Sequence, residues 1–89
     1  MRIFFTQHAS RRLLERYLNP MEVMEVLEKG RVIEEYPEDE RGPRWLSCGK
    51  TSKNYLHVVW AKREEGLIII TVYKPSPEKW ETPYKRRNP

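Results

Sequence analysis

The side chains best suited to proton transfer in this chain are its two histidines, His8 and His57. An imidazole near its reference pKa of about 6.5 can accept or donate a proton at neutral pH. His8 is followed at helical spacing by Arg12 and Arg16, so these side chains share one helix edge. Guanidinium groups in this arrangement can hold phosphate oxygens through their planar fork. The same cations also fit a solvated helix face, with Arg16 paired to a neighbouring glutamate.

His57 lies where two β-branched and aromatic runs face each other across a short turn. Residues 55–61 and 67–73 predict two strands, and residues 64–66 predict a three-residue hairpin loop closed by a glycine. This register places His57 directly opposite Tyr73. The hairpin is therefore the element that we expect to position the second histidine.

The two faces of this hairpin differ in polarity. The odd-numbered positions include Tyr55, Thr71 and Tyr73 beside His57, so we expect this face to carry chemistry. The alternative is that His57 is a structural residue that donates to a nearby backbone group. The even-numbered positions are all apolar and are predicted to face the core: Leu56, Val58, Trp60, Ile68, Ile70 and Val72.

Two helices are predicted before the long strands. Thr6 is a suitable cap for a helix over residues 7–18. The second helix is predicted to begin at Asn19, with a capping box, and to end at Gly30. The predicted buried stripes comprise Ala9, Leu13, Leu14 and Tyr17 in the first helix and Pro20, Val23, Met24 and Leu27 in the second.

The remaining pattern predicts an α+β fold. Residues 2–6 predict an edge strand, and residues 31–36 and 44–49 predict two further strands. Two N-terminal helices are thus expected to pack on a meander antiparallel sheet of about four strands, plus the edge strand. We expect a single domain over residues 1–75 and a Pro-rich basic C-terminal tail over residues 76–89.

The tail interleaves cations with aromatic residues. Such an arrangement can follow a nucleic-acid strand, with aromatic rings stacking on bases. Alternatively, the tail is a frayed terminus in which Trp80 covers the edge of the sheet. The residues concerned are Lys74, Lys79, Trp80, Tyr84, Lys85, Arg86 and Arg87.

Composition narrows the functional classes. The chain of 89 residues carries 17 Lys and Arg against 13 Asp and Glu, a net charge of +4 that is compatible with a polyanionic partner. A single cysteine, Cys48, indicates a reducing cytoplasm, and no apolar run is long enough to predict a membrane span. Neither a cofactor nor a metal is expected, because phosphate-binding glycine loops and zinc-ligand spacings do not occur.

Several short motifs, taken in order, resemble the prokaryotic family called domain of unknown function 4258. The resemblance covers roughly residues 5–75, and its specificity lies in the order and spacing of the motifs. They are His8-Ala9-x-x-Arg12-x-x-x-Arg16, Gly30-x-Val32-Ile33-Glu34-x-Tyr36-Pro37, Leu56-His57-Val58-Val59 and Ile70-Thr71-Val72-Tyr73-x-Pro75.

This family looks related to small RelE- and BrnT-type toxins, which share two helices packed on an antiparallel sheet and often cleave RNA. The resemblance implies that five residues form one set: His8, Arg12, Arg16, His57 and Tyr73. We therefore expect a toxin-like, metal-independent endoribonuclease of a toxin–antitoxin system. RNA and an antitoxin protein are the expected partners.

In this interpretation His57 is a general base or acid, and His8 is the second proton-transfer group. Arg12 and Arg16 hold the phosphate, while Tyr73 orients His57 or stacks on a base. The alternative function is a non-catalytic small basic module that binds nucleic acid or a protein. The acidic segment 34–40 does not suit RNA contact, and we expect it to lie away from the site.

Overall fold

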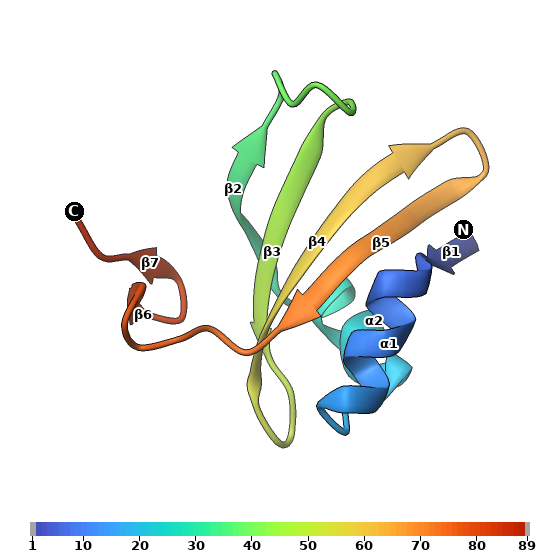
Figure 1. Cartoon of the computed structure of the whole chain (residues 1–89). Coiled ribbons are helices and arrows are strands. Elements are labelled where there is room, and N and C mark those ends of the chain that lie inside the picture. The colour runs from blue at the N-terminus through green and yellow to red at the C-terminus, as the bar shows by residue number, and fades with distance from the viewer. Residues whose placement is uncertain (1, 89) are drawn as a thin grey trace.

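A computed structural model describes residues 2–88 and shows two helices on one face of a five-stranded sheet, with a short hairpin near the C-terminus (Figure 1). The elements are β1 (Arg2–Phe5), α1 (Gln7–Glu15), α2 (Pro20–Lys29), β2 (Arg31–Tyr36), β3 (Arg44–Lys50), β4 (Tyr55–Arg63), β5 (Gly66–Tyr73), β6 (Trp80–Thr82) and β7 (Lys85–Arg86). The predicted α+β class, with two N-terminal helices and a mostly antiparallel sheet, is confirmed.

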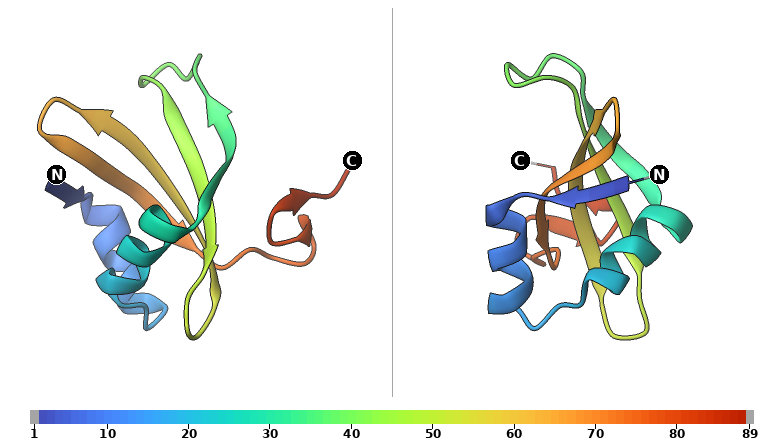
Figure 2. Two further views of the ribbon diagram at one scale, coloured as in Figure 1. Left: turned by 180° about the vertical axis from the view of Figure 1, so that it is seen from behind. Right: turned by 90° about the vertical axis from the view of Figure 1, so that its right-hand side faces the viewer.

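The sheet has the strand order β1-β5-β4-β3-β2. Strands β2 to β5 form an antiparallel meander, and β1 adds to the β5 edge in parallel. Both helices cover the same face, as the two turned views show (Figure 2). The opposite face is not covered by helices, and the C-terminal segment contacts it.

The turn between β4 and β5 is tighter than predicted. Arg63 pairs with Gly66, so the loop contains two residues, 64–65, and not three. Gly66 has a φ of 155° and pairs with Arg2 of β1. A side chain at this position would clash with the Arg2 backbone, so β1 can approach β5 closely because residue 66 is a glycine.

A β-bulge in β5 compensates for the shorter turn. Val59 lies opposite Thr71, whereas Trp60 lies opposite Ile69, which leaves Ile70 as the extra residue. The bulge restores the predicted register at the far end of the hairpin. It also exchanges the faces of β5, since Ile69 enters the core in place of Ile70.

The core lies between the helices and the sheet. Val72 packs there as predicted, as do Leu56, Val58 and Trp60 of β4. The prediction for Ile68 and Ile70 was wrong because of the bulge. A sequence pattern of period two does not show where such an inserted residue will fall. The buried core cluster comprises Ala9, Leu13, Leu18, Val23, Val26, Leu56, Val58, Ile69 and Val72.

The first helix begins as predicted but ends early. Thr6 caps it by accepting a hydrogen bond from the Ala9 N–H at 3.0 Å. The helix ends at Glu15, and Tyr17 has a positive φ of 54°. The predicted burial of Leu14 and Tyr17 was wrong: Leu14 lies outside the buried stripe of α1 and is 80% exposed, and Tyr17 at the reversal is 92% exposed.

The second helix has the predicted capping box. The Asn19 side chain accepts from the Met21 N–H at 2.8 Å, and Glu22 accepts from the Asn19 N–H at 3.1 Å. The buried stripe differs from the prediction, however. Val26 lies in the core while Met24 is 37% exposed, because the helix is rotated to pack against β3 and β4.

Candidate nucleic-acid interface

The sheet face opposite the helices, here called the open face, carries the polar cluster of the central hairpin. Antiparallel pairing places Cys48, His57 and Tyr73 in one row across β3, β4 and β5. The predicted pairing of His57 with Tyr73 is thus confirmed. His57 nevertheless has no exposed surface.

Both nitrogens of His57 have hydrogen-bond partners. Nε2 lies 2.6 Å from the carbonyl oxygen of Pro83, and Nδ1 lies 3.4 Å from the Tyr73 hydroxyl. A carbonyl oxygen can only accept, so Nε2 carries the proton and the neutral Nδ1 accepts from Tyr73. The local contacts therefore select one tautomer and join the histidine to the tyrosine.

Aromatic packing completes the surroundings of His57. The indole of Trp80 lies edge-on to the imidazole, and the Tyr73 ring contacts it at an interplanar angle of 61°. Burial lowers the pKa of His57 from its ordinary value, while the hydrogen bond to Pro83 opposes this effect. Burial also raises the pKa of Tyr73. Both groups are consequently neutral near pH 7.

A charged cluster lies beside this pair. Arg86 donates two hydrogen bonds of 3.0 Å to Glu34, and its guanidinium lies over the Trp80 ring at 4.5 Å. Tyr36 donates its hydroxyl proton to Glu34. The hydrogen bonds from Arg86 lower the pKa of Glu34, and burial together with Glu34 raises the pKa of Tyr36 to about 12.

A pocket of about 340 Å³ opens above this cluster. It is lined by Tyr73, Ser76, Lys79, Trp80 and Arg86. The lining joins two cations, two hydroxyl groups and an aromatic wall, which together suit a phosphate and a base.

His8 reaches the same sheet face from α1. Its Nε2 lies 3.1 Å from the Thr71 hydroxyl oxygen, and its side chain is exposed. Thr71 and Tyr73 are two residues apart on β5, so their side chains point the same way with Cα atoms about 7 Å apart. The structure thus brings His8, His57 and Tyr73 to one face.

The two arginines of the predicted set, Arg12 of α1 and Arg16 at its C-cap, are less closely engaged. Arg12 forms an ion pair of 3.3 Å with Glu15, and Arg16 is exposed at the C-cap of the helix. Within residues 2–88, no hydrogen bond joins either guanidinium to His57 or Tyr73. They supply positive charge near the face and are not part of the pocket.

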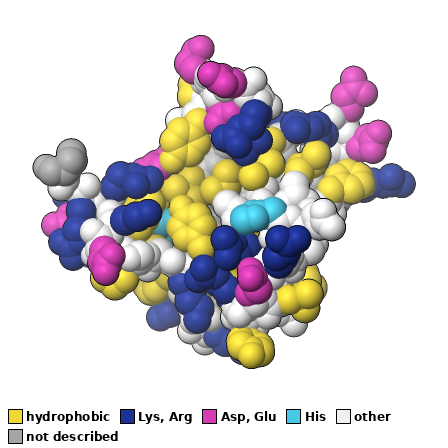
Figure 3. All heavy atoms as spheres, viewed as in Figure 1, with side chains coloured by type: hydrophobic (Ala, Val, Ile, Leu, Met, Phe, Trp, Pro, Cys, Tyr) yellow, Lys and Arg dark blue, Asp and Glu magenta, His cyan; other side chains and the backbone are white. Residues whose placement is uncertain are grey.

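Positive charge surrounds the open face as a whole. Figure 3 shows Lys and Arg side chains around a histidine and a group of hydrophobic side chains, with most acidic side chains in view toward the rim. A polyanion meets favourable potential on such a surface. The distribution favours an extended anionic ligand over a neutral one.

The family comparison decides the relationship of this chain to known sequences. The family model described as Domain of unknown function (DUF4258) matches residues 5–74. The chain belongs to the DUF4258 family. The search of the curated proteins gave no match, and the search of the solved structures gave none either.

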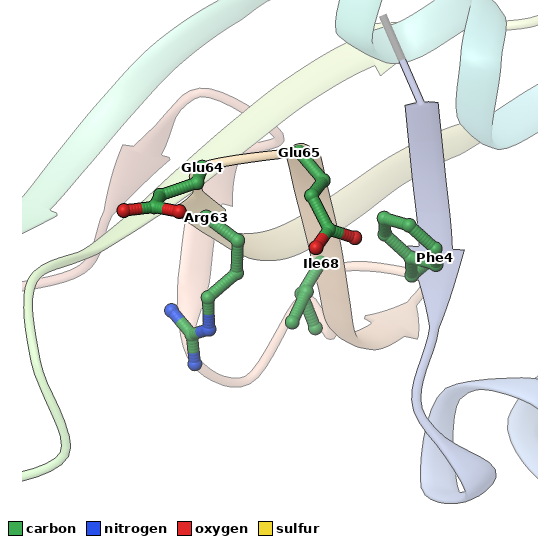
Figure 4. Close-up of a pocket in the computed structure, with 5 residues that line it drawn as sticks. All are labelled: Phe4, Arg63, Glu64, Glu65 and Ile68. Atoms are coloured by element: carbon green, nitrogen blue, oxygen red, sulfur yellow. The ribbon is translucent and has the colours of Figure 1, made fainter.

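A second hollow of this DUF4258 domain, of about 500 Å³, lies beside the β4–β5 turn. In Figure 4 the carboxylate of Glu65 points into the space between Phe4 of β1 and Ile68 of β5. Glu64 also lines this hollow, so two carboxylates accompany its one guanidinium. Anionic ligands are disfavoured here relative to the pocket beside Tyr73.

Sequence reasoning missed Glu34, among other residues of the candidate site. Glu34 was expected to lie away from it with the rest of the acidic segment, but it pairs with Arg86 beside His57. The sequence signal that could have placed Glu34 on the same face as Tyr36 was their spacing, since residues i and i+2 of a strand share a face.

Two further properties concern the described part of the chain. It contains no helix long and apolar enough to cross a membrane and no group of three metal-ligating side chains.

Proposed function

We propose that this protein is a toxin-like endoribonuclease of the RelE/BrnT type, which binds single-stranded RNA on the open face and cleaves it without a metal. The observation that supports this proposal is the pocket beside Tyr73. There a hydroxyl held by a buried histidine lies together with the cations Lys79 and Arg86. A toxin–antitoxin role, a cytoplasmic location and an antitoxin that covers the basic face belong to the same proposal.

The geometry changes the role expected for His57. Because the imidazole is buried, RNA meets the Tyr73 hydroxyl and not the histidine. Tyr73 accepts the proton of the ribose 2′-OH as its own proton passes to Nδ1 of His57. The resulting imidazolium keeps its hydrogen bond to the Pro83 carbonyl, which favours the charged form.

Cleavage then exchanges one bond to phosphorus for another. The 2′ oxygen forms a bond to phosphorus while the bond from phosphorus to the 5′ oxygen breaks. This leaves a 2′,3′-cyclic phosphate and a free 5′ hydroxyl. Lys79 and Arg86 stabilise the charge that develops on the phosphorane. His8 donates a proton to the leaving 5′ oxygen, and Arg12 and Arg16 hold the adjoining RNA strand.

The test is incubation of purified protein with end-labelled RNA in EDTA. Tyr73→Phe should keep RNA affinity but lose about 10²- to 10⁴-fold in cleavage rate, because only the hydroxyl is removed. Tyr55→Phe, at an exposed tyrosine of the same strand pair, is the matched control and should cleave normally. A cyclic phosphate end and resistance of the DNA analogue are also expected. Undiminished cleavage by Tyr73→Phe would contradict the assigned role.

One observation favours the second candidate, a non-catalytic basic RNA-binding module. His57 has no exposed surface, and both of its ring nitrogens are bonded within the protein. A purely structural histidine would have these properties. In that case RNA should stay intact while being retained with a strong dependence on salt, because binding would release counterions.

A further inference from the structure

We propose that the C-terminal segment 75–88, here called the strap, is a lid with an open and a closed position, latched by Glu34. In the closed position it completes the pocket, and in the open position it takes the pocket apart. The opening itself is independent of any ligand, whereas its effect on cleavage rests on the proposed ribonuclease function.

Among the described residues, the strap contacts the sheet through side chains and the Pro83 carbonyl, and the two share no backbone ladder. Strands β6 and β7 pair with each other in a separate two-stranded sheet. Figure 1 shows this hairpin standing apart from the five-stranded sheet, connected by an extended segment. Segments with few backbone hydrogen bonds to the rest of a domain open at low free-energy cost.

The contacts that close the strap are few and specific. The Pro83 carbonyl accepts from His57, and the indole of Trp80 covers the same imidazole. The Tyr84 ring lies under the guanidinium of Arg31 at 4.3 Å and against Tyr55 at 5.9 Å. All of these contacts lie on the open face.

The strongest polar contact between strap and sheet is the paired hydrogen bond of Arg86 with Glu34. Two parallel charge-assisted bonds fix the guanidinium in direction as well as in position. Arg86 lines the pocket, whereas Glu34 does not. Glu34 therefore acts as a positioning residue, because it holds a pocket cation without lining the pocket itself.

The strap supplies four of the five residues that line the pocket, namely Ser76, Lys79, Trp80 and Arg86. The fifth, Tyr73, belongs to β5. Opening the strap consequently removes both cations and exposes His57 to water. A pocket of this kind exists in the closed position alone.

The chain carries a natural reporter of this opening. Cys48, its single cysteine, is fully buried and lies opposite His57 in the row under the strap. His57, the neighbour of Cys48 in this row, is itself covered by Pro83 and Trp80 of the strap. Burial raises the pKa of Cys48 to about 11, so the thiol should react slowly until the strap opens.

The experiment measures the rate at which a soluble disulfide reagent modifies Cys48 in the native full-length chain. Glu34→Gln should raise this rate about fivefold or more, because the latch loses its charge. Lys85→Gln is the matched control, since Lys85 pairs at 3.2 Å with Glu81 inside the strap. The control should react at the wild-type rate.

Two further measurements separate a moving strap from general loosening. The rate increase should depend weakly on added urea, because strap opening exposes little surface compared with global unfolding. Glu34→Asp, which keeps the charge, should restore part of the protection. A Glu34→Gln rate equal to that of the wild type, or one that rises steeply with urea, would overturn the proposal.

RNA cleavage by the same variants distinguishes this inference from the proposed function. Faster Cys48 modification together with slower cleavage in Glu34→Gln supports both. If Glu34→Gln speeds Cys48 modification but neither the wild type nor any variant cleaves RNA, the lid proposal is supported and the ribonuclease proposal is refuted. Faster modification with wild-type cleavage overturns the statement that the lid completes the pocket.

Discussion

The imidazole of His57 meets the indole of Trp80 edge-on, with ring centroids 4.4 Å apart and an interplanar angle of 89°. This contact joins the first part of β4 to the start of β6, and it closes the open face over the histidine. Edge-to-face contacts favour one relative orientation of the two rings, and they contribute stability beyond that gained by burying apolar area. The burial of His57 therefore depends on the C-terminal segment.

The first prediction concerns the aromatic side of this contact. Trp80 is 4% exposed, so Trp80→Ala should lower the free energy of unfolding by about 3 kcal/mol through lost burial and a residual cavity. Trp80→Phe keeps a ring against His57 and should lower it by less than half as much. Urea unfolding followed by circular dichroism measures both values. Equal losses in the two variants would show that ring contact with the histidine contributes nothing.

The second prediction concerns pH. Burial lowers the pKa of His57 in the folded state, so as the pH falls from neutral the unfolded chain binds this proton first. The contribution of His57 to stability is present above its unfolded pKa of about 6.5 and is lost as the pH falls toward the lower folded value. The charged groups that face it are Arg86 of β7 and Glu34 of β2. We expect the free energy of unfolding to decline between about pH 7 and pH 5.

The matched variants for this pH dependence are His57→Gln and His8→Gln. The first should flatten the decline, whereas the second should leave it in place because His8 is exposed. The pKa of Glu34 is lowered from its ordinary value of 4.5, so the loss of stability on protonating Glu34 occurs below that pH and outside this window. A decline that persists unchanged in His57→Gln would assign the effect to other groups.

The third prediction concerns the contact between α2 and β3. A Cβ at Gly30 would clash with the backbone carbonyl oxygens of Val26 and Cys48. Gly30→Ala should therefore lower the free energy of unfolding by about 2–3 kcal/mol, as overpacking does. Gly42 is a suitable control, because it has a φ of 103° and open space around it. Gly42→Ala should lower the free energy of unfolding by about 1 kcal/mol, because of its backbone conformation alone. A larger loss in Gly42→Ala than in Gly30→Ala would contradict this account.

The fourth prediction concerns a buried hydroxyl near the start of α2. Thr51 donates to Glu22 at 2.8 Å, and its oxygen accepts from the Asn54 N–H at 3.1 Å. Thr51→Val keeps the shape but leaves a buried carboxylate short of a donor, so it should cost about 2 kcal/mol. Thr51→Ser retains the hydroxyl and should cost less than 1 kcal/mol. Thermal unfolding at pH 7 compares the two variants. Equal melting temperatures would show that the hydrogen bond from Thr51 to Glu22 does not contribute to stability.

Local features of the fold could be predicted because they depend on neighbouring residues. The caps at Thr6 and Asn19 form within single helical turns, and each appears in the structure as expected. The end of α1 could not be predicted in this way. The chain reverses at Tyr17 to direct Leu18 into the core, and this requirement comes from packing and not from helix periodicity.

The candidate site likewise has one part that local sequence predicts and one part that tertiary contacts determine. Hairpin pairing over a short loop placed His57 opposite Tyr73, which the residue pattern predicted correctly. The burial of that imidazole follows from Trp80 and Pro83, and no sequence period relates these residues to β4. The partnership of Glu34 with Arg86 likewise joins residues from opposite ends of the fold.

The amino-acid sequence by itself determined the α+β class, the helix starts, the central hairpin and the family, since these depend on short-range spacing of residue types. Only the tertiary structure decided that the tail folds back over the open face and that His57 is enclosed there. The physical reason is that burial results from contacts between distant segments. Their geometry is set by a bulge, a tight turn and a closing hairpin, which leave little trace in residue spacing.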